Sequence, residues 1–424
     1  MERICILGGR PLEGQINISG AKNAALPALA ATLLVEGVCT IGNMPRVKDV
    51  YTMLELLKNL GARIEVTESD DSLLIRVDTT TLHDFIVSYG LVKTMRASVL
   101  VLGPLVARFG KANVSLPGGC AIGARPINFH LKGLKILGAR IALEEGYVIA
   151  RAQKMQPGKI EFEFPTVTGT ENLMMVAATI EGETVIENVA REPEIIDLAN
   201  MLGKMGAQIE GAGTGRIKIR GSSSLKPVEH HIIPDRIEAG TFMTAAAITK
   251  GKVRIKRCPK KYLCAVIEKL REIGTRFIDV GDNEIEVMGA DEIRAVDLRT
   301  SPYPGFPTDM QAQFMALLCI ACGVSIVTET VFENRFMHAC ELGRMGADIR
   351  IEGHSAIVRG VRQLKGAPVM ATDLRASACL ILAGLAAKGE TIVSRIYHLD
   401  RGYDKIEKKF QQLGAIIRRE REII

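Results

Sequence analysis

LKNLGARI, residues 57–64, decides the fold, because close variants of this stretch return five more times along the chain. They are LKILGARI (134–141), LGKMGAQI (202–209), LREIGTRF (270–277), LGRMGADI (342–349) and FQQLGAII (410–417). A second glycine-containing marker alternates with the first: EGVCTI (36–41), GKANVSL (110–116), EGETVI (181–186), KGKVRI (250–255), CGVSIV (322–327) and KGETIV (388–393). Two markers in a constant order predict six structural repeats of about 70 residues each.

Each repeat contains two different predicted helices. The first is apolar on nearly all sides, as in AALPALAATLL (24–34), and such a helix must be buried. We expect the glycine of the marker that follows it to cap its C-terminus. The second is amphipathic, with Val50, Met53, Leu54, Leu57 and Leu60 at helical spacing in the first repeat. Short β-branched runs such as RIKIRG (216–221) read as strands. Buried helices surrounded by strands and outer helices predict an inside-out α/β barrel.

The two ends of the sequence complement each other. The sixth repeat stops after LGAIIRRERE, whereas RICILGGRPLEGQINISGAK (3–22) resembles the closing segment of the fifth repeat. We therefore expect the first twenty residues to complete the sixth repeat. This predicts two domains of three repeats each, 21–233, and 234–424 with 1–20. The chain would cross twice between them, near Gly20 and around 222–235, as a hinge suited to closure on a ligand.

Composition excludes several classes of function. The 424 residues carry 47% hydrophobic and 24% charged side chains, as soluble globular proteins do. The start, MERICILGGRPLEG, lacks the basic segment and apolar run typical of a signal peptide, and no apolar run is long enough to predict a membrane span. Nine cysteines without disulfide-framework spacing indicate a reducing, cytoplasmic location. A net charge of +6, spread along the chain with only 4% aromatics and no tryptophan, disfavours nucleic acid and suits a small anionic ligand.

Polar residues stand immediately before the buried helices. Because equivalent positions of the repeats should lie at the same end of each domain, we expect six helix N-termini to converge on one anion-binding cleft. Its cations would be Lys22, Arg96, Arg125, Arg335, Arg375 and Arg401. The alternative for each arginine is an ordinary surface charge. The shared repeat position favours a ligand role for Arg96 and Arg375, and says little for Arg335 and Arg401.

The loop LPGGCAIGARP (116–126) places one thiol between glycines and next to a guanidinium. Pro126 fits a first helical turn, so Arg125 would stand at a helix N-terminus and the thiol pKa of Cys120 would be lowered. The alternative is an incidental buried cysteine. Cys319 and Cys322 have the spacing of a metal pair, but they lie in an apolar helix without a second pair, so we expect no metal there.

Two further side chains are candidates with competing interpretations. Asp309, in FPTDMQAQF (306–314), is the best carboxylate candidate for a site, or a helix-capping aspartate. His130 either faces a ligand or, as we expect, belongs to the core. No Ser-His-Asp set, Walker A loop or dinucleotide fingerprint is evident.

The motifs resemble the UDP-N-acetylglucosamine enolpyruvyl transferase family nearly end to end. The similarity lies in SGAKNAALP (19–27), LPGGCAIGARP (116–126), TVTGTEN (166–172), PDRIEAGTF (234–242), FPTDMQAQF (306–314), ETVFENRFMH (329–338) and DRGYDKIE (400–407). The resemblance implies a two-domain inside-out α/β barrel. It also implies transfer of the enolpyruvyl group of phosphoenolpyruvate to the 3′-hydroxyl of UDP-N-acetylglucosamine, the first committed step of peptidoglycan precursor synthesis. The implied enzyme is a cytoplasmic monomer that uses no cofactor and no metal.

The resemblance also implies roles for individual residues. Cys120 would be the general acid, able to form an adduct with phosphoenolpyruvate and to be alkylated by fosfomycin, and Asp309 would take the hydroxyl proton. Phosphoenolpyruvate would be held by Lys22, Asn23, Arg125, Arg375 and Arg401, of which Lys22 and Arg401 also count as catalytic. The nucleotide sugar would be held by Asn23, Arg96, Arg125, Pro126, Ile127, Asn128, Phe129, Pro165, Thr166, Val167, Thr168, Gly169, Asp309 and Val331. Some family members carry a basic residue where Pro165 stands, so the contacts of Pro165 to Thr168 stay open.

Two rival functions remain to be compared. The other enolpyruvyl transferase of this fold acts on shikimate 3-phosphate, but its asparagine-alanine-glycine-threonine motif is absent here and that family lacks the cysteine loop. A catalytically silent nucleotide-sugar binding protein is the second rival. The complete set of Lys22, Cys120, Asp309 and Arg401 argues against it.

Overall fold

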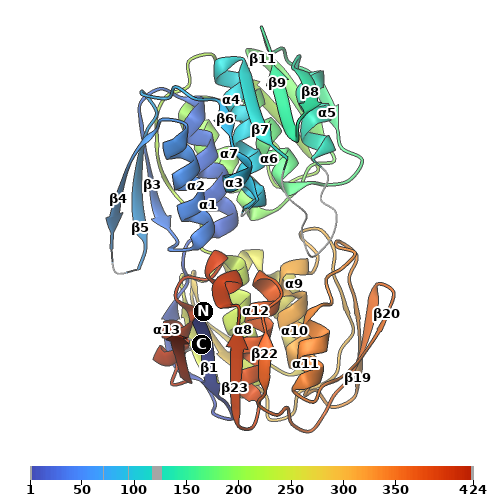
Figure 1. Cartoon of the computed structure of the whole chain (residues 1–424). Helices are drawn as coiled ribbons and strands as arrows, with labels where there is room; N and C mark the ends of the chain where they lie inside the picture. Colours follow the sequence, from blue (N-terminus) through green and yellow to red (C-terminus); the bar gives the residue numbers. More distant parts are fainter. Residues whose placement is uncertain (1, 70, 94, 117–126, 422–424) are drawn as a thin grey trace. The chain divides into compact units, whose positions relative to one another are not determined.

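The computed structural model describes residues 2–69, 71–93, 95–116 and 127–421. The chain divides into two compact units (Figure 1). The 20–233 unit comprises the described residues of that range, and the 234–421 unit comprises residues 2–19 and 234–421. Each unit has its own hydrophobic core. No helix in the described ranges is long and apolar enough to cross a membrane.

Six four-stranded sheets, three in each unit, follow one plan. A short strand pairs in parallel with its neighbour, and the two remaining pairs are antiparallel. In the 20–233 unit the sheets are β14 (Glu229–His231), β3 (Val38–Met44), β5 (Leu73–Asp78) and β4 (Arg63–Glu68); β6 (Ile86–Val87), β7 (Lys111–Ser115), β9 (Tyr147–Arg151) and β8 (Arg140–Glu144); and β10 (Lys159–Glu161), β11 (Gly182–Glu187), β13 (Arg216–Gly221) and β12 (Gln208–Glu210).

The 234–421 unit repeats this plan with the N-terminus built in. Its sheets are β2 (Glu13–Asn17), β15 (Lys252–Lys256), β17 (Glu284–Met288) and β16 (Arg276–Gly281); β18 (Leu298–Arg299), β19 (Val324–Thr328), β21 (Ser355–Arg359) and β20 (Asp348–Glu352); and β22 (Pro368–Met370), β23 (Glu390–Ser394), β1 (Glu2–Leu7) and β24 (Ile416–Arg421). β1 pairs with β23 and with β24, so the first strand of the chain completes the sixth repeat, as its sequence indicated.

The parallel strand at the edge of every sheet belongs to the preceding repeat of the same unit. β6 and β10 pass from one repeat to the next, and β14 returns from the third repeat to β3 of the first. In the other unit β18 and β22 pass forward, and β2 joins β15 of the fourth repeat. Each unit is thereby a closed ring of three repeats, in which every sheet contains a strand from a neighbouring repeat.

Within the described ranges, six apolar helices form the interiors of the two units, three in each, as expected. They are α1 (Lys22–Ala31), α4 (Leu102–Phe109), α6 (Val167–Ala177), α8 (Arg236–Ile248), α10 (Gln311–Leu318) and α12 (Leu374–Ala386), and three are extended by the 3₁₀ turns η1 (Thr32–Leu34), η2 (Arg96–Val101) and η4 (Thr308–Met310). The amphipathic helices are α2 (Lys48–Asn59), α5 (Asn128–Ile136), α7 (Pro193–Met205), α9 (Cys264–Ile273), α11 (His338–Arg344) and α13 (Ile406–Gln412). Shorter turns are α3 (Tyr89–Val92), η3 (Lys260–Tyr262) and η5 (Ile396–Arg401).

The backbone conformation of the glycine in the first marker explains why the repeat can be recognised in the sequence. Gly61, Gly138, Gly206, Gly274, Gly346 and Gly414 all have φ between 83° and 121°. Only glycine adopts this region without strain, and here it turns the chain from the amphipathic helix into the next strand. The prediction for the second marker was wrong in part. Gly110 caps α4 with φ 69°, whereas the C-cap residues of α6 and α10 are Ala178 and Cys319, four residues before their glycines.

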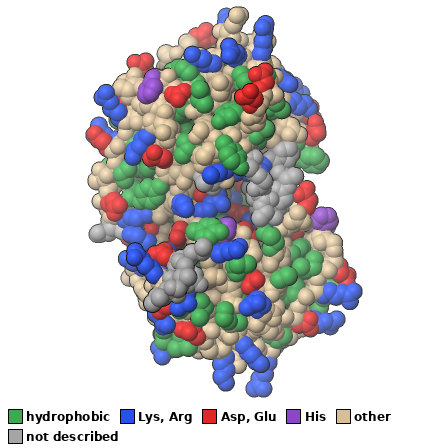
Figure 2. All heavy atoms as spheres, in the orientation of Figure 1, with side chains coloured by type: hydrophobic (Ala, Val, Ile, Leu, Met, Phe, Trp, Pro, Cys, Tyr) green, Lys and Arg blue, Asp and Glu red, His purple; other side chains and the backbone are tan. Residues whose placement is uncertain are grey.

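Charged side chains of both signs are interspersed over the visible face of each unit (Figure 2). Many form ion pairs across neighbouring strands, such as the exposed pair of Arg220 with Glu183 at 3.0 Å and the half-buried pair of Arg254 with Glu284. Such pairs contribute about 0–1 kcal/mol each to stability. The outer surface therefore carries much of the charge of the sequence, while the charges described next are buried.

Candidate active site

Asp309 lies at the centre of a buried charge cluster in the 234–421 unit. Its Oδ1 accepts a hydrogen bond from Arg335 Nη2 at 2.7 Å, and its Oδ2 accepts one from Arg375 Nη2 at 2.8 Å. Both arginine side chains are only 5% exposed, while the Asp309 side chain keeps 26% of its surface accessible. The carboxylate is thus held from two sides and remains open to a ligand.

Asp309 is not the helix cap that the sequence allowed. Pro307 occupies the N-cap position of η4, and Asp309 makes no capping hydrogen bond. Asp235 and Asp373 do cap their helices, each accepting two backbone N–H bonds at the start of α8 and α12. Asp309 stands two residues after its N-cap position, as Arg375 does in α12, which is why the two side chains meet between neighbouring helix ends.

The electrostatics of the cluster follow from burial and opposite charges. Burial alone would raise the pKa of Asp309, but the charges and hydrogen bonds of Arg375 and Arg335 hold it well below its usual value. Burial would lower the pKa of Arg375, and the charge of Asp309 more than offsets this. Asp309 and Arg375 are therefore both ionised at neutral pH.

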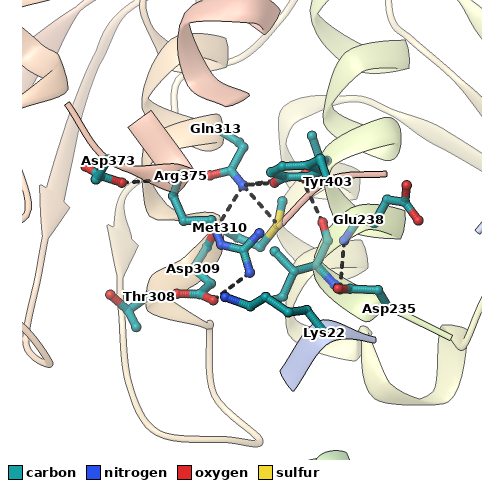
Figure 3. A network of polar contacts seen from close by, with 12 residues as sticks. Lys22, Asp235, Glu238, Thr308, Asp309, Met310, Gln313, Asp373, Arg375 and Tyr403 are labelled. Atoms are coloured by element: carbon teal, nitrogen blue, oxygen red, sulfur yellow. Dashed lines mark hydrogen bonds and ion pairs between the residues drawn. The ribbon is translucent and has the colours of Figure 1, made fainter. Parts of the chain in front are cut away.

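A second layer of polar groups supports Arg375 (Figure 3). The amide nitrogen of Gln313 donates to the hydroxyl of Tyr403 at 3.2 Å and to the backbone oxygen of Asp309 at 2.9 Å. Tyr403 also exchanges a hydrogen bond with the hydroxyl of Thr241 at 2.9 Å, and the Arg375 guanidinium lies 5.4 Å from the centre of its ring. Sequence reasoning missed Gln313 and Tyr403; a glutamine inside an apolar helix was the available signal.

One donor of this cluster makes no hydrogen bond to any residue of the described ranges. It is Nη1 of Arg375, which is buried, whereas Nη2 of the same side chain donates to Asp309. A buried charged donor without an acceptor is costly, and an anionic ligand would remove that cost. The surface-charge interpretation of Arg335 and Arg375 is therefore wrong, since both are buried in this cluster.

The 20–233 unit brings two of the predicted nucleotide-sugar segments together. Ile127, Asn128 and Phe129 form the N-cap and first turn of α5. Thr166 is the N-cap of α6 and accepts from the backbone N–H of Gly169; Pro165 precedes it, and Val167 and Thr168 follow in the first turn. The rings of Phe129 and Phe162 meet edge to face at 6.0 Å.

His130 joins these two helix ends and belongs to the core, as expected. Asn172 accepts from the backbone N–H of Gly103 at 2.9 Å, which fixes its amide so that its NH₂ donates to His130 Nδ1, also at 2.9 Å. His130 Nε2 therefore carries the proton and faces the hydroxyl of Thr168 at 3.3 Å. Burial, assisted by the charge of Arg96, lowers the pKa of His130 to about 4, so the ring is neutral.

The remaining predicted residues lie at helix ends or in loops. Lys22 and Asn23 begin α1, and Lys22 Nζ lies 3.3 Å from Asp49 Oδ2. Arg96 begins η2, Arg401 ends η5, and Val331 follows β19 in an exposed loop position. The residues predicted at Cys120, Arg125 and Pro126 lie outside the described ranges.

Metal coordination finds no support among the described residues. No group of three His, Cys, Asp or Glu side chains in these ranges is arranged to hold a metal ion. Cys319 is buried, and burial raises the pKa of its thiol to about 12, while Cys322 is exposed. The two side chains therefore lie in different environments despite their spacing.

Comparison with known proteins identifies the class. A family model described as EPSP synthase (3-phosphoshikimate 1-carboxyvinyltransferase) matches residues 6–410, so the chain belongs to this family of enolpyruvyl transferases. The crystal structure of the enolpyruvyl transferase NikO from Streptomyces tendae covers 99% of this chain and 98% of its own at 27% identity, with a TM-score of 0.88. An EPSP synthase from Acinetobacter baumannii, 18% identical with a TM-score of 0.76, shows the shared inside-out α/β barrel fold.

The curated relatives are more specific. A protein of Thermodesulfovibrio yellowstonii named UDP-N-acetylglucosamine 1-carboxyvinyltransferase is 57% identical over 99% of this chain and 100% of its own. One of Geobacter metallireducens with the same name is 57% identical over the full length of both chains. The resemblance stated from the motifs is thus confirmed, and the chain is an enzyme of the transferase class.

Proposed function

We propose that this protein transfers the enolpyruvyl group of phosphoenolpyruvate to the 3′-hydroxyl of UDP-N-acetylglucosamine. The hydroxyl oxygen bonds to C2 while C3 gains a proton; the C2–phosphate bond then breaks and C3 returns a proton, giving the enolpyruvyl ether and inorganic phosphate. The observation that carries the proposal is the 57% identity, end to end, with relatives named for this reaction. The reaction would be the first committed step of peptidoglycan precursor synthesis, in the cytoplasm.

The Asp309 cluster supports a base and an anion site in one place. We infer that Asp309 accepts the proton of the sugar hydroxyl, since it is an ionised and partly accessible carboxylate. While both arginines hold it, Asp309 is a weak base. Nη1 of Arg375 makes no hydrogen bond within the described ranges. An anionic substrate accepting from it would draw the charge of Arg375 away from Asp309 and strengthen the base.

The other proposed roles follow the motifs. Cys120 protonates C3 of phosphoenolpyruvate, and Lys22, Asn23, Arg125 and Arg401 hold its carboxylate and phosphate together with Arg375. The nucleotide sugar binds Asn23, Arg96, Arg125 to Phe129, Pro165 to Gly169, Asp309 and Val331. The two domains would comprise residues 21–233, and residues 1–20 together with 234–424. The active form would be a monomer, and sedimentation at the mass of a single chain would support this.

Two experiments on Cys120 test its role. Mass spectrometry after exposure to fosfomycin should find an adduct on the peptide that contains Cys120. The Cys120→Ser variant should lose nearly all turnover and still bind UDP-N-acetylglucosamine in calorimetry. Loss of nucleotide-sugar binding in the variant would instead make Cys120 a structural residue.

A further inference from the structure

Glu329 is a buried carboxylate whose two oxygens both accept hydrogen bonds. It follows β19 directly and is 1% exposed. Its Oε1 accepts from the hydroxyl of Thr300 at 2.8 Å and from the backbone N–H groups of Val331 and Phe332 at 2.8 and 3.2 Å. Its Oε2 accepts from the hydroxyl of Thr308 at 2.8 Å. One side chain therefore fixes both the 330–332 loop and the turn that contains Asp309.

The contact with Thr308 has a direction that matters for Asp309. A carboxylate only accepts, so the proton of the Thr308 hydroxyl must point to Glu329. The oxygen of Thr308 then presents its lone pairs to Arg335, whose Nη1 donates to it at 2.7 Å. Nη2 of the same guanidinium binds Asp309 at 2.7 Å. The orientation of the Asp309 carboxylate thus depends, through Arg335 and Thr308, on Glu329.

The 329–335 segment closes on itself and leaves Arg335 little freedom. Phe332, anchored by its N–H to Glu329, places its ring 5.1 Å from the Arg335 guanidinium. Thr330 adds two hydrogen bonds to Thr300, at 2.9 and 2.7 Å. Glu329 lies where these contacts meet, so removing its acceptors loosens the loop and the guanidinium together.

We propose that Glu329 is a positioning residue for the nucleotide sugar: it fixes the Val331 loop and, through Thr308 and Arg335, the carboxylate of Asp309. This inference rests on the proposed function, because that function makes Val331 and Asp309 sugar contacts. Glu329 touches neither substrate and acts only through these neighbours. Its loss should therefore weaken nucleotide-sugar binding and catalysis, and leave the affinity for phosphoenolpyruvate nearly unchanged.

The charge of Glu329 gives a signature that loosened packing would not. The ionisable groups around the cluster in the described ranges are Arg335, Arg375, Asp309, Glu329, Asp373, Asp235, His338 and Tyr403. Replacing Glu329 by Gln removes a negative charge from the neighbourhood of Asp309, which lowers the pKa of Asp309 further even though Arg335 is held less firmly. The acid limb of the kcat profile should then move to lower pH as kcat falls.

The test compares Glu329→Gln with Glu333→Gln, an exposed glutamate of the same loop. Calorimetry with UDP-N-acetylglucosamine alone should show about tenfold to hundredfold weaker binding for Glu329→Gln and an unchanged affinity for Glu333→Gln. Steady-state kinetics should show a raised KM for the nucleotide sugar, a KM for phosphoenolpyruvate within twofold of the wild type, and the shifted acid limb. Equal binding and an unmoved pH profile in a folded Glu329→Gln variant would overturn the proposal.

Thr308 gives an independent test should Glu329→Gln fail to fold. Thr308→Ser keeps the hydroxyl and should bind the nucleotide sugar as the wild type does, whereas Thr308→Val should lose the same tenfold or more. Equal binding by Thr308→Ser and Thr308→Val would contradict the relay. A wild-type protein that fails to bind UDP-N-acetylglucosamine at all would refute the proposed function instead, so the two failures are distinguishable.

Discussion

His130 should make the 20–233 unit lose stability in mild acid. Burial and the nearby charge of Arg96 hold its pKa at about 4, against an ordinary value of 6.5. Between these values the unfolded chain binds a proton that the folded chain does not. The contribution of neutral His130 is therefore complete above pH 6.5 and is lost progressively as the pH falls toward 4. The gap corresponds to roughly 3 kcal/mol, at about 1.36 kcal/mol for each pH unit.

The assay is urea unfolding, followed by circular dichroism, of the wild type and His130→Gln between pH 7.5 and pH 4.5. Glutamine removes the titrating ring, so the difference in unfolding free energy between the two proteins should move in favour of the variant by about 2–3 kcal/mol across this range. Exposed His354→Gln is the control and should follow the wild type. A constant difference between His130→Gln and the wild type at all pH values would refute the burial argument.

Three further predictions concern single residues. Burial, with Glu194 and Glu192 nearby, raises the pKa of Glu171 well above its usual value, so the folded protein loses stability as the pH rises above 4.5. In urea unfolding, Glu171→Gln should gain stability relative to the wild type as the pH is raised from 4.5 to 8. Arg375→Lys cannot keep both arms of the guanidinium and should lower kcat/KM for phosphoenolpyruvate about tenfold to hundredfold, whereas Arg350→Lys, at a side chain 78% exposed, should match the wild type. Gly346→Ala has space for its Cβ and should cost only about 1–2 kcal/mol of backbone strain. The Cβ of Gly360→Ala would instead lie 1.6 Å from a backbone oxygen. Thermal unfolding should therefore show a far larger loss of stability for Gly360→Ala than for Gly346→Ala.

The fold could be predicted from the sequence because its repeats have a local cause. Where the chain leaves each amphipathic helix, one residue, such as Gly206, has a positive φ and must therefore be glycine. The same glycine consequently recurs at one position of every repeat. The pairing of a short strand with the sheet of the next repeat could not be predicted from such a local signal. Strands such as β6, of two residues, are too short to leave a period of their own, and their pairing depends on ring closure.

The repeat pattern favoured only those candidate residues that stand at a shared repeat position. Arg375 stands at a shared repeat position and was favoured for that reason, whereas Arg335 lies in a loop and carried no such signal. The sequence could not distinguish a capping Asp309 from a paired one, because the choice depends on two arginines 26 and 66 residues away. Glu329 was invisible for the same reason: its partners come from three separate segments.

The most direct test of the account is phosphate release from phosphoenolpyruvate by the purified protein, with UDP-N-acetylglucosamine and shikimate 3-phosphate as alternative acceptors. We expect release with the nucleotide sugar and none with shikimate 3-phosphate. Release with shikimate 3-phosphate would keep the fold and overturn the substrate. Silence with both acceptors, from folded protein that still binds the nucleotide sugar, would contradict the proposed reaction and favour a binding protein.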